Sequence, residues 1–485
     1  MFVFGPDEFL KYAKPGKAVP LVEEIPPNSL TPREAYRRLA ARPDSFLLES
    51  AGGSPVISEY SMVGGDPIHV ISTKGKDPFP ELRAAVNRFS PGSLPIDLPF
   101  WGGAVGFLSY DVARYIERIP VLTDDDLKLP ETTFIFPGVC LVFAHLTGKK
   151  YLIVNEVCGR NPRLSLKKAT ARLEEARSRL AEEPTPAETC RPENNEVPVV
   201  SANMDNRSYE RIVNRAKKYI FAGDIFQANL SVRFQVPAPA DSFSLYDRLL
   251  KINPSPFSSY LDFGNWQLVS SSPERLVKLR DGLVETRPIA GTRRRGRDES
   301  EDDDLTADLI LNEKERAEHV MLVDLERNDI GRVCRYGTVK PTELFTIEKY
   351  SHVIHIVSNI TGEMDEGKDQ FDLIRAVFPG GTITGCPKVR CMEIIEELEP
   401  TRRGPYTGSI GYFGFSGNAD FNIIIRTFTV NGGEAYVQAG AGIVADSDPA
   451  REYYESVSKA AALLEAAGVK REEVKWETLP TSTAS

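Results

Sequence analysis

Residues 421–444 read FNIIIRTFTVNGGEAYVQAGAGIV, and they contain two strand-like runs joined by a glycine turn. The first run, 421–428, is almost wholly apolar, and the second, 438–444, ends in alternating glycines. A short glycine turn such as Asn431-Gly432-Gly433 between two such runs is typical of an antiparallel β-hairpin. Asp281-Gly282 follows another strand-like run in the same way. The stretch therefore predicts antiparallel sheets.

Helical and strand-like segments occur in both halves of the chain without a regular strand–helix alternation. Helical periodicity is present in 165–183, 209–221, 305–325 and 452–467, and strand-like runs in 45–48, 68–72, 133–142, 150–157, 266–270 and 274–279. This order predicts the α+β class, with antiparallel sheets and surrounding helices. Two similar glycine-rich segments, 103–108 and 408–413, are interpreted as two strands that pack closely.

A proline-rich polar stretch divides the chain. At roughly 100–200 residues per domain, 485 residues allow two to four domains. We predict a linker at 185–202, which separates an N-terminal region, 1–184, from a second region, 203–470, and a tail, 471–485.

Composition excludes several classes of protein. A net charge of -10 argues against nucleic-acid binding, which normally needs a basic domain. We find no apolar run of about 18 residues and no secretory signal pattern, so no membrane span and a cytoplasmic location are expected. The six cysteines form no CxxC pair, which is typical of free thiols in a reduced compartment.

Several polar residues stand in apolar surroundings. Arg426 lies inside the apolar run 421–428, where an arginine needs an anion: either a carboxylate ligand or a structural ion pair. The glycines of 440–442 permit close approach of a ligand to the backbone, although a tight bulge explains them equally well. The segment 379–388 precedes a helix and can cradle an anion, but it is not a P-loop.

Two helices carry acidic residues next to apolar stripes. Glu318 borders the stripe of one helix, and Glu455 shares a face with Glu452 and Lys459 on another, which begins after Asp448-Pro449. For each helix taken alone, a solvated face is the more common explanation. A carboxylate that leans into a core must instead be paired or bind a cation, and two from two helices suit Mg²⁺. His352 and His355 fall on opposite faces of a predicted strand.

Taken together and in this order, these segments resemble the chorismate-utilising enzymes, and among them anthranilate synthase component I. The resemblance is dense over 205–465 and looser over 20–160. The matching segments are 223–227 (GDIFQ), 271–274 (SSPE), 288–293 (PIAGTR), 318–319, 324–329 (DLERND), 352–358, 380–388, 422–427 and 439–455.

The resemblance implies a role for each matching residue. Glu318 and Glu455 correspond to Mg²⁺ ligands, and Tyr406 and Arg426 to residues that hold a chorismate carboxylate. Glu274 corresponds to the general acid and His355 to the histidine of pyruvate loss; Gln227 and Thr382 complete the catalytic set. Backbone contacts and the pocket wall are assigned to Gly291, Thr292, Gly440, Ala441, Gly442 and Lys459.

Two positions discriminate among the relatives. Isochorismate and salicylate synthases have a lysine base where this chain has Gln227, which cannot deprotonate water. Many aminodeoxychorismate synthases have a nucleophilic lysine where this chain has Ala290, which cannot form a covalent intermediate. The pattern favours direct attack by ammonia.

The N-terminal region matches the family's tryptophan-feedback motif at 47–50, with Ser50 at the contact position. Its partner segment supplies Pro256, Phe257 and Ser258, where relatives show Tyr then Met at the last two positions. Feedback inhibition by L-tryptophan is expected. A buried strand end followed by a serine turn is the alternative for the first segment.

The implied activity is that of a lyase that converts chorismate and ammonia to anthranilate and pyruvate, the first step of tryptophan biosynthesis. We find no glutaminase motif, so a separate glutamine amidotransferase subunit (component II) and a hetero-oligomer are expected. Two alternatives stay open: aminodeoxychorismate synthase component I of the folate pathway, and a non-catalytic homologue that binds tryptophan or chorismate.

Overall fold

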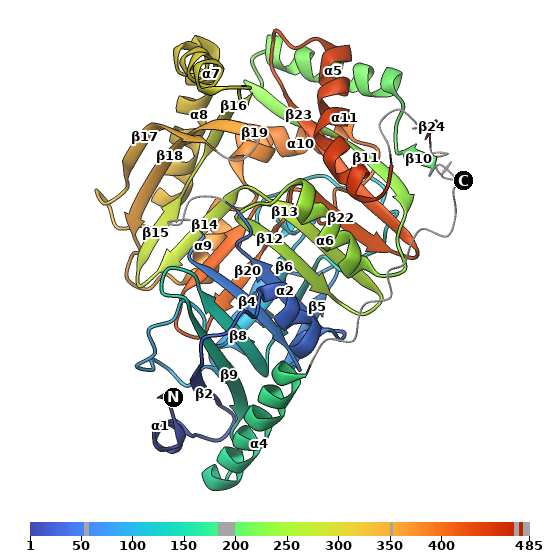
Figure 1. Cartoon of the computed structure of the whole chain (residues 1–485). Coiled ribbons are helices and arrows are strands. Elements are labelled where there is room, and N and C mark those ends of the chain that lie inside the picture. The colour runs from blue at the N-terminus through green and yellow to red at the C-terminus, as the bar shows by residue number, and fades with distance from the viewer. Residues whose placement is uncertain (53–57, 183–198, 350–352, 470–474, 479–485) are drawn as a thin grey trace.

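Two large sheets face each other and enclose the core (Figure 1). The computed structural model describes residues 1–52, 58–182, 199–349, 353–469 and 475–478. Within these residues, every strand pair is antiparallel except β10 with β24. The α+β class with antiparallel sheets is thereby confirmed.

The first sheet contains fourteen strands. Their order is β1 (Phe2–Phe4), β2 (Ala18–Ile25), β9 (Lys149–Val157), β8 (Val139–Ala144), β4 (Tyr60–Gly65), β3 (Ser45–Glu49), β12 (Phe257–Asp262), β13 (Trp266–Ser272), β22 (Thr427–Asn431), β23 (Glu434–Ile443), β11 (Gln227–Pro237), β10 (Val199–Ala202) and β24 (Lys475–Thr478), with β19 (Gly385–Cys386) beside β11.

The second sheet contains ten strands. Their order is β16 (Ile289–Arg294), β18 (Val353–Glu363), β15 (Leu283–Thr286), β14 (Arg275–Arg280), β21 (Ala419–Asn422), β20 (Ser409–Gly414), β6 (Gly103–Leu108), β7 (Thr132–Phe136) and β5 (His69–Thr73), with β17 (Lys340–Lys349) beside β18.

Helices cover the outer faces and ends of the sheets (Figure 1). They are α1 (Pro6–Tyr12), α2 (Pro32–Ala35), α3 (Phe79–Phe89), α4 (Pro162–Ala181), α5 (Asn206–Phe221), α6 (Ser242–Ile252), α7 (Glu299–Leu311), α8 (Glu313–Gly331), α9 (Gln370–Val377), α10 (Lys388–Leu398) and α11 (Pro449–Ala466), with one short 3₁₀ turn, η3 (Gly381–Ile383), that matters for the site.

The two halves of the chain share both sheets. In the first sheet β3 pairs with β12, and in the second β6 pairs with β20. The latter pair is the two glycine-rich segments of the sequence, and Gly106 stands opposite Gly411. The prediction that these segments pack as neighbouring strands is confirmed.

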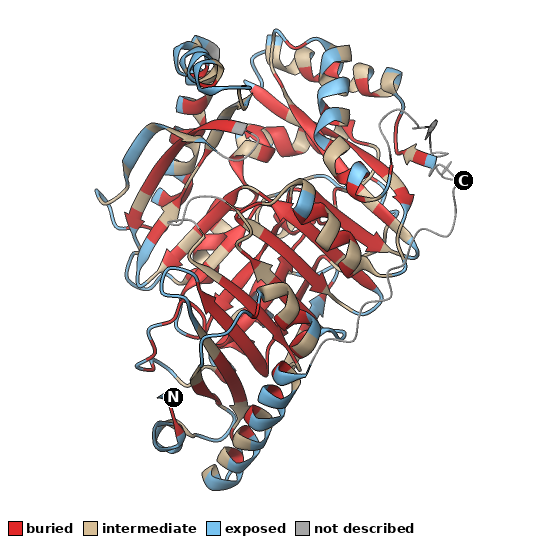
Figure 2. Cartoon of the chain, viewed as in Figure 1, coloured by how far each residue is buried: buried red, intermediate tan, exposed pale blue. Residues whose placement is uncertain are grey.

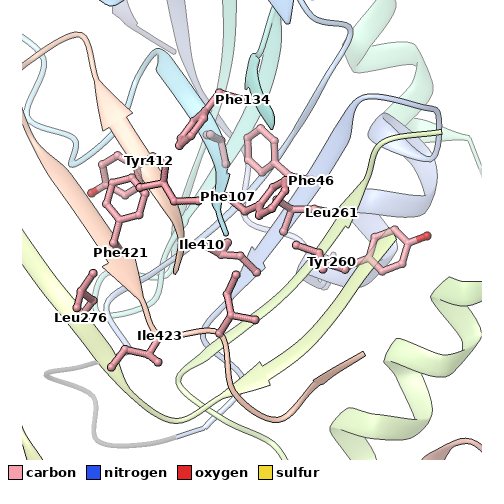
Figure 3. Close-up of a cluster of buried hydrophobic side chains, with 14 of the residues drawn as sticks. Phe46, Phe107, Phe134, Tyr260, Leu261, Leu276, Ile410, Tyr412, Phe421 and Ile423 are labelled. Carbon is pink, nitrogen blue, oxygen red and sulfur yellow. The ribbon is translucent and has the colours of Figure 1, made fainter. Parts of the chain in front are cut away.

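Aromatic and aliphatic side chains from both sheets meet between them (Figure 3). Phe107 of β6 is fully buried and packs edge-on against Trp266 of β13, with ring centroids 5.1 Å apart. Figure 2 shows the burial of the described residues: the strands are mostly buried, and many of the exposed residues lie on helix faces and loops.

Three predicted elements differ from the structure. The run 133–142 forms two strands in different sheets, β7 and β8, because Pro137-Gly138 interrupts it. The segment 305–325 belongs to two helices, since Asn312 ends α7 and caps α8 by accepting a hydrogen bond from the Glu315 amide (3.1 Å). The run 421–428 is broken at residues 423–426.

The predicted linker and tail also contain paired strands. Most of the linker lies outside the described residues, but its last residues, 199–202, form β10, which pairs with β11. Residues 475–478 of the predicted tail form β24, parallel to β10.

The predicted start of α11 is confirmed, since Asp448 accepts a hydrogen bond from the Arg451 amide and Pro449 is the first helical residue.

A search of the helices in the described residues finds none with the length and apolarity that a membrane crossing requires.

Phe107 provides a test of the contact between the sheets. Phe107→Ala should lower the free energy of unfolding by about 3–5 kcal/mol, because it removes a buried ring at the point where β6 meets β13. Denaturant unfolding followed by circular dichroism measures the change. Leu146→Ala, at an exposed position, should change it by less than about 0.5 kcal/mol; equal losses would contradict the packing described.

Candidate active site

A buried carboxyl group lies at the junction of β13 and β14. Glu274 is only 7% exposed, and its backbone oxygen accepts a hydrogen bond from the Ile423 amide (3.0 Å). Burial raises the pKa of Glu274 to about 7, although the Thr382 hydroxyl and the Arg426 charge act in the opposite direction. At neutral pH this group therefore retains a substantial protonated fraction.

Arg426 lies in the loop between β21 and β22 rather than in a strand. Its φ is +51°, in the left-handed region that non-glycine residues rarely adopt. The guanidinium donates one long hydrogen bond to Asn253 (3.5 Å), and in the described residues no carboxylate lies within ion-pair distance of it. Burial lowers the pKa of Arg426, and the nearby Glu274 partly offsets this. The site thus holds a partly buried cation that is available to an anionic ligand.

The predicted tyrosine lies next to this loop. Tyr406 belongs to the turn before β20, and the Thr407 amide donates to the Ile424 carbonyl oxygen (2.8 Å). The loop of Arg426 and the turn of Tyr406 are thereby hydrogen-bonded to each other.

A second group of predicted residues lies along β11 and β23. Gln227 begins β11, is 6% exposed, and donates from Nε2 to Glu318 Oε1 of α8 (3.1 Å). Gly442 of β23 lies beside this amide, so a Cβ there would approach Gln227 Nε2 to 2.4 Å. The glycine therefore makes room for the Gln227 side chain.

Helix α11 closes the other side of β23. Lys459 Nζ donates to the Gly440 carbonyl oxygen (3.0 Å) and pairs with Glu455 (2.9 Å). Ala441 lies between the two glycines and pairs with Leu230 of β11. Glu318 thus contacts the start of β11 from α8, and Glu455 contacts Lys459 on α11, the helix that packs against β23.

His355 of β18 is buried and neutral. Its Nδ1 faces the Gly291 carbonyl oxygen at 3.3 Å, so Nδ1 carries the proton and Nε2 the basic lone pair. Burial, together with the Arg426 charge, lowers the pKa of His355 to about 4. Gly291 has φ +63° and forms a bulge in β16, and Thr292 pairs with His355 in the ladder. The Thr292 side chain and His352 lie outside the described residues.

A buried ion pair joins the two groups of residues. Arg403 and Glu399 are 1% and 2% exposed at their side chains and lie 2.8 Å apart. Arg403 also donates to the carbonyl oxygens of Ile383 (3.0 Å) and Asn229 (2.6 Å), and Glu399 accepts from Ser231 of β11. The pair therefore ties η3, which carries Thr382, to β11, which carries Gln227.

The sequence did not single out this pair, and it assigned no role to Glu326, a partly buried carboxyl on α8. A signal exists for the pair, since Glu399 and Arg403 have the i, i+4 spacing of an ion pair. Nothing in the local sequence shows that both side chains are buried.

The two predicted metal ligands, Glu318 and Glu455, lie on α8 and α11. In the described part of the chain, no group of three or more His, Cys, Asp and Glu side chains is arranged to hold a metal. The predicted pair, Glu318 and Glu455, offers only carboxylate oxygens, which suit Mg²⁺ when a substrate and water supply the remaining ligands. The donor chemistry fits Mg²⁺, provided that Glu455 exchanges its contact with Lys459.

A separate cavity lies between the two sheets, with about 680 Å³ of space including its open mouth. All four residues of the predicted tryptophan site line it: Ser50, Pro256, Phe257 and Ser258. Its wall also carries charges of both signs, among them Glu59, Lys278 and Arg280. Such a wall can accommodate a zwitterion with an apolar side chain.

Comparison with known proteins identifies a match over most of the chain. Residues 44–465 match the family model described as chorismate binding enzyme. The chain is 43% identical to anthranilate synthase component 1 of Acetivibrio thermocellus, over 96% of this chain and 98% of that protein. It is 45% identical to aminodeoxychorismate synthase component 1 of Bacillus subtilis (strain 168), over 91% and 96% respectively.

Among solved structures, anthranilate synthase component I of Streptococcus pneumoniae TIGR4 superposes with a TM-score of 0.75 at 33% identity. The match covers 91% of this chain and 99% of that one.

The Arg403–Glu399 pair gives a test of the site's framework. Glu399→Gln should lower the free energy of unfolding by about 3–5 kcal/mol, because it leaves a buried guanidinium without its counter-charge. Denaturant unfolding at pH 7 measures the loss. Glu393→Gln, which breaks a half-exposed ion pair with Arg390, should lower the free energy of unfolding by less than about 1 kcal/mol. A similarly small loss for Glu399→Gln would contradict a stabilising role of the buried pair.

Proposed function

Because the chain belongs to the chorismate binding enzyme family, we propose that it is the synthase subunit that converts chorismate and ammonia to anthranilate and pyruvate. The observation that carries this proposal is the amide of Gln227. In relatives that add water, a lysine base stands at this position. An amide has no basic lone pair that could deprotonate water at neutral pH, whereas ammonia needs no deprotonation before it attacks.

Gln227 is also suited to hold the nucleophile. Its Nε2 donates to Glu318, whereas its Oε1 is buried and has no hydrogen-bond partner among the described residues. A buried acceptor without a donor is costly. We assign Oε1 to accept an N–H of ammonia and so to point the nitrogen lone pair at the ring carbon C2.

Glu274 supplies the proton for the leaving group. Attack at C2 expels the C4 hydroxyl, and hydroxide is a poor leaving group unless it is protonated. With its pKa near 7, Glu274 carries a proton in a useful fraction of molecules at neutral pH. The hydroxyl then leaves as water, and Glu274 becomes a carboxylate.

Arg426 balances the charge of the substrate. Chorismate carries two carboxylates, and a buried guanidinium recognises one of them through two parallel hydrogen bonds. We assign Tyr406 and the backbone of 440–442 to the same carboxylate, because the turn of Tyr406 is hydrogen-bonded to the loop of Arg426. Thr382 and Lys459 complete the wall.

His355 serves the second half of the reaction. Loss of pyruvate requires removal of the proton at C2, after which the ring becomes aromatic. A neutral imidazole with its proton on Nδ1 presents Nε2 as a base. The low pKa of His355 keeps the ring neutral at physiological pH.

Mg²⁺ is part of the proposal. Glu318 and Glu455 would hold the ion, which would neutralise the second substrate carboxylate.

Aminodeoxychorismate synthase is the second candidate, since a protein of that name is among the similar ones. It aminates at C4 and retains the pyruvyl group. Ala290 favours the first candidate, because alanine cannot supply the nucleophile that many such synthases use. A homologue that binds without catalysis is disfavoured by the protonated Glu274 and the unpaired Arg426, which are suited to turnover as well as to binding.

The proposal includes regulation and a partner. We assign the cavity between the sheets to L-tryptophan, whose indole would lie against Phe257 and whose charged ends would meet Glu59 and Lys278 or Arg280. A glutamine amidotransferase subunit would deliver ammonia within a hetero-oligomer of the tryptophan pathway.

The product of the reaction tests the proposed function. The purified chain with chorismate, MgCl₂ and an ammonium salt at mildly alkaline pH should form anthranilate, measured by its fluorescence, and an equal amount of pyruvate. L-Tryptophan should inhibit the reaction, and Ser50→Phe, which fills the cavity, should remove that inhibition. Chorismate consumed without anthranilate or pyruvate would instead favour amination at C4.

Glu274 gives a test that depends on pH. Because only the protonated acid is active, kcat should fall as pH rises through about 7. Glu274→Gln should reduce kcat by roughly 10²–10⁴ at every pH, since an amide cannot donate the proton. The folded state binds this proton more tightly than the unfolded state does, so the stability that Glu274 provides is complete below about 4.5 and is lost as pH rises through about 7.

The same Glu274→Gln variant should therefore lose less stability between pH 5 and pH 8 than the wild type does. Thermal unfolding at the two pH values measures this difference. A wild-type rate that stays flat up to pH 9 would contradict the role of Glu274 as the acid.

A further inference from the structure

The mechanism above leaves one partly buried carboxyl group without a role. Glu326 lies on α8 and forms no ion pair within the described residues. Lys388 of α10, whose charge acts on Glu326, is already held by Asp329 and by the Val377 carbonyl oxygen (2.9 Å). A buried carboxylate without a counter-charge is unfavourable, so such a group tends to take up a proton.

The hydrogen-bond pattern at Glu326 points to the same state. The Thr286 hydroxyl of β15 lies within hydrogen-bonding distance of both Glu326 Oε2 and the Leu276 carbonyl oxygen (3.0 Å). A hydroxyl has a single proton, and a carbonyl oxygen can only accept. Both contacts are satisfied together when Thr286 donates to Leu276 and a protonated Glu326 donates to Thr286.

Glu326 lines one small cavity, and two other residues of its lining adjoin Glu274: Arg275 follows it in the chain, and Ile423 is hydrogen-bonded to its backbone. Its lining includes Glu326, Thr286, Asp329, Gly380, Gly381 and Ile423. Ile423 is the residue whose amide donates to the Glu274 backbone, and Gly381 precedes Thr382. The carboxyls, hydroxyl and backbone groups of this lining provide polar partners for a water molecule.

The charges around Glu326 favour its protonated form. Burial raises the pKa of Glu326 to about 8, and the carboxyls of Glu274 and Asp329 act in the same direction. The Thr286 hydroxyl and the Lys388 ammonium act against them. Arg275, which lines the same cavity, is already paired with Asp420 and Glu285.

We propose that Glu326 holds the proton that restores Glu274 to its acid form after each turnover. The proposal rests on the proposed function, in which Glu274 gives up a proton to the leaving hydroxyl. In this proposal Glu326 does not contact the substrate. It acts only through Glu274, to which it supplies the proton.

The transfer balances without a further reactant. When the bond between C4 and its oxygen breaks, the oxygen takes the proton of Glu274 and leaves as water. The carboxyl O–H of Glu326 then gives its proton, through water in the cavity, to the Glu274 carboxylate. Glu326 regains a proton from solvent, which receives the one that the added nitrogen releases.

Glu326→Gln separates this role from a structural one. The glutamine amide can still donate to Thr286, so a structural role predicts unchanged kinetics. A proton donor cannot be replaced by an amide. We expect one rapid turnover per active site, from enzyme in which Glu274 is already protonated, and then a steady-state kcat at least about 10-fold below wild type with an unchanged KM for chorismate.

Rapid-mixing fluorescence of anthranilate measures both phases, and Glu313→Gln, at an exposed position on the same helix, is the matched control. Steady-state kinetics within two-fold of wild type, with no burst, would overturn the proposal.

A second measurement needs no substrate. The infrared difference spectrum between the wild type and Glu326→Gln at pH 7 should contain the carbonyl band of a protonated carboxyl group. Its absence would overturn the proposal even if the variant is slow. If the wild type forms no anthranilate, the proposed function fails and the relay fails with it, whereas a wild type that is active without the band contradicts the relay alone.

Discussion

The contact between Arg403 and Glu399 is the constraint on which the candidate site depends. Both charged groups are removed from water, so each requires the opposite charge of the other and hydrogen bonds to neutral backbone groups. Those neutral partners belong to η3 and β11, which are far apart in the sequence. Satisfying one buried guanidinium therefore fixes where Thr382 and Gln227 stand relative to each other. The candidate catalytic side chains Thr382 and Gln227 are therefore positioned by this polar core as well as by the sheets.

Burial then sets the protonation states within this framework, and it acts in opposite directions on the two kinds of group. The same removal from water makes Glu274 a weaker acid and His355 a weaker base. At pH 7 His355 is neutral and Glu274 retains a substantial protonated fraction, and in the part of the chain that the structure describes no carboxylate lies within ion-pair distance of Arg426. An anionic ligand at this point would therefore meet the positive charge of Arg426 and a partly protonated Glu274 rather than a fully ionised carboxylate.

The interleaved sheets bring the cavity between them next to the candidate active site. Glu274 precedes Arg275, and Arg275 lines the cavity between the sheets. Asn422 lines that cavity too, donates to the Phe257 carbonyl oxygen (3.1 Å), and leads into the loop of Arg426. The cavity between the sheets is therefore bounded by residues that lead to Glu274 and to the loop of Arg426, so β14 and β21 connect it to the candidate active site.

The sequence by itself determined the features that depend on neighbouring residues: the turn Asn431-Gly432-Gly433, the capped start of α11, and the motifs that mark the family. Each is decided by φ preferences or hydrogen bonds within a few residues. Only the tertiary structure decided that 133–142 is divided between two sheets, that Arg426 adopts a left-handed turn, and that Glu326 is partly buried without an ion pair among the described residues. These outcomes depend on contacts between segments distant in the chain, and the energy of a buried charge is set by what surrounds it rather than by what precedes it.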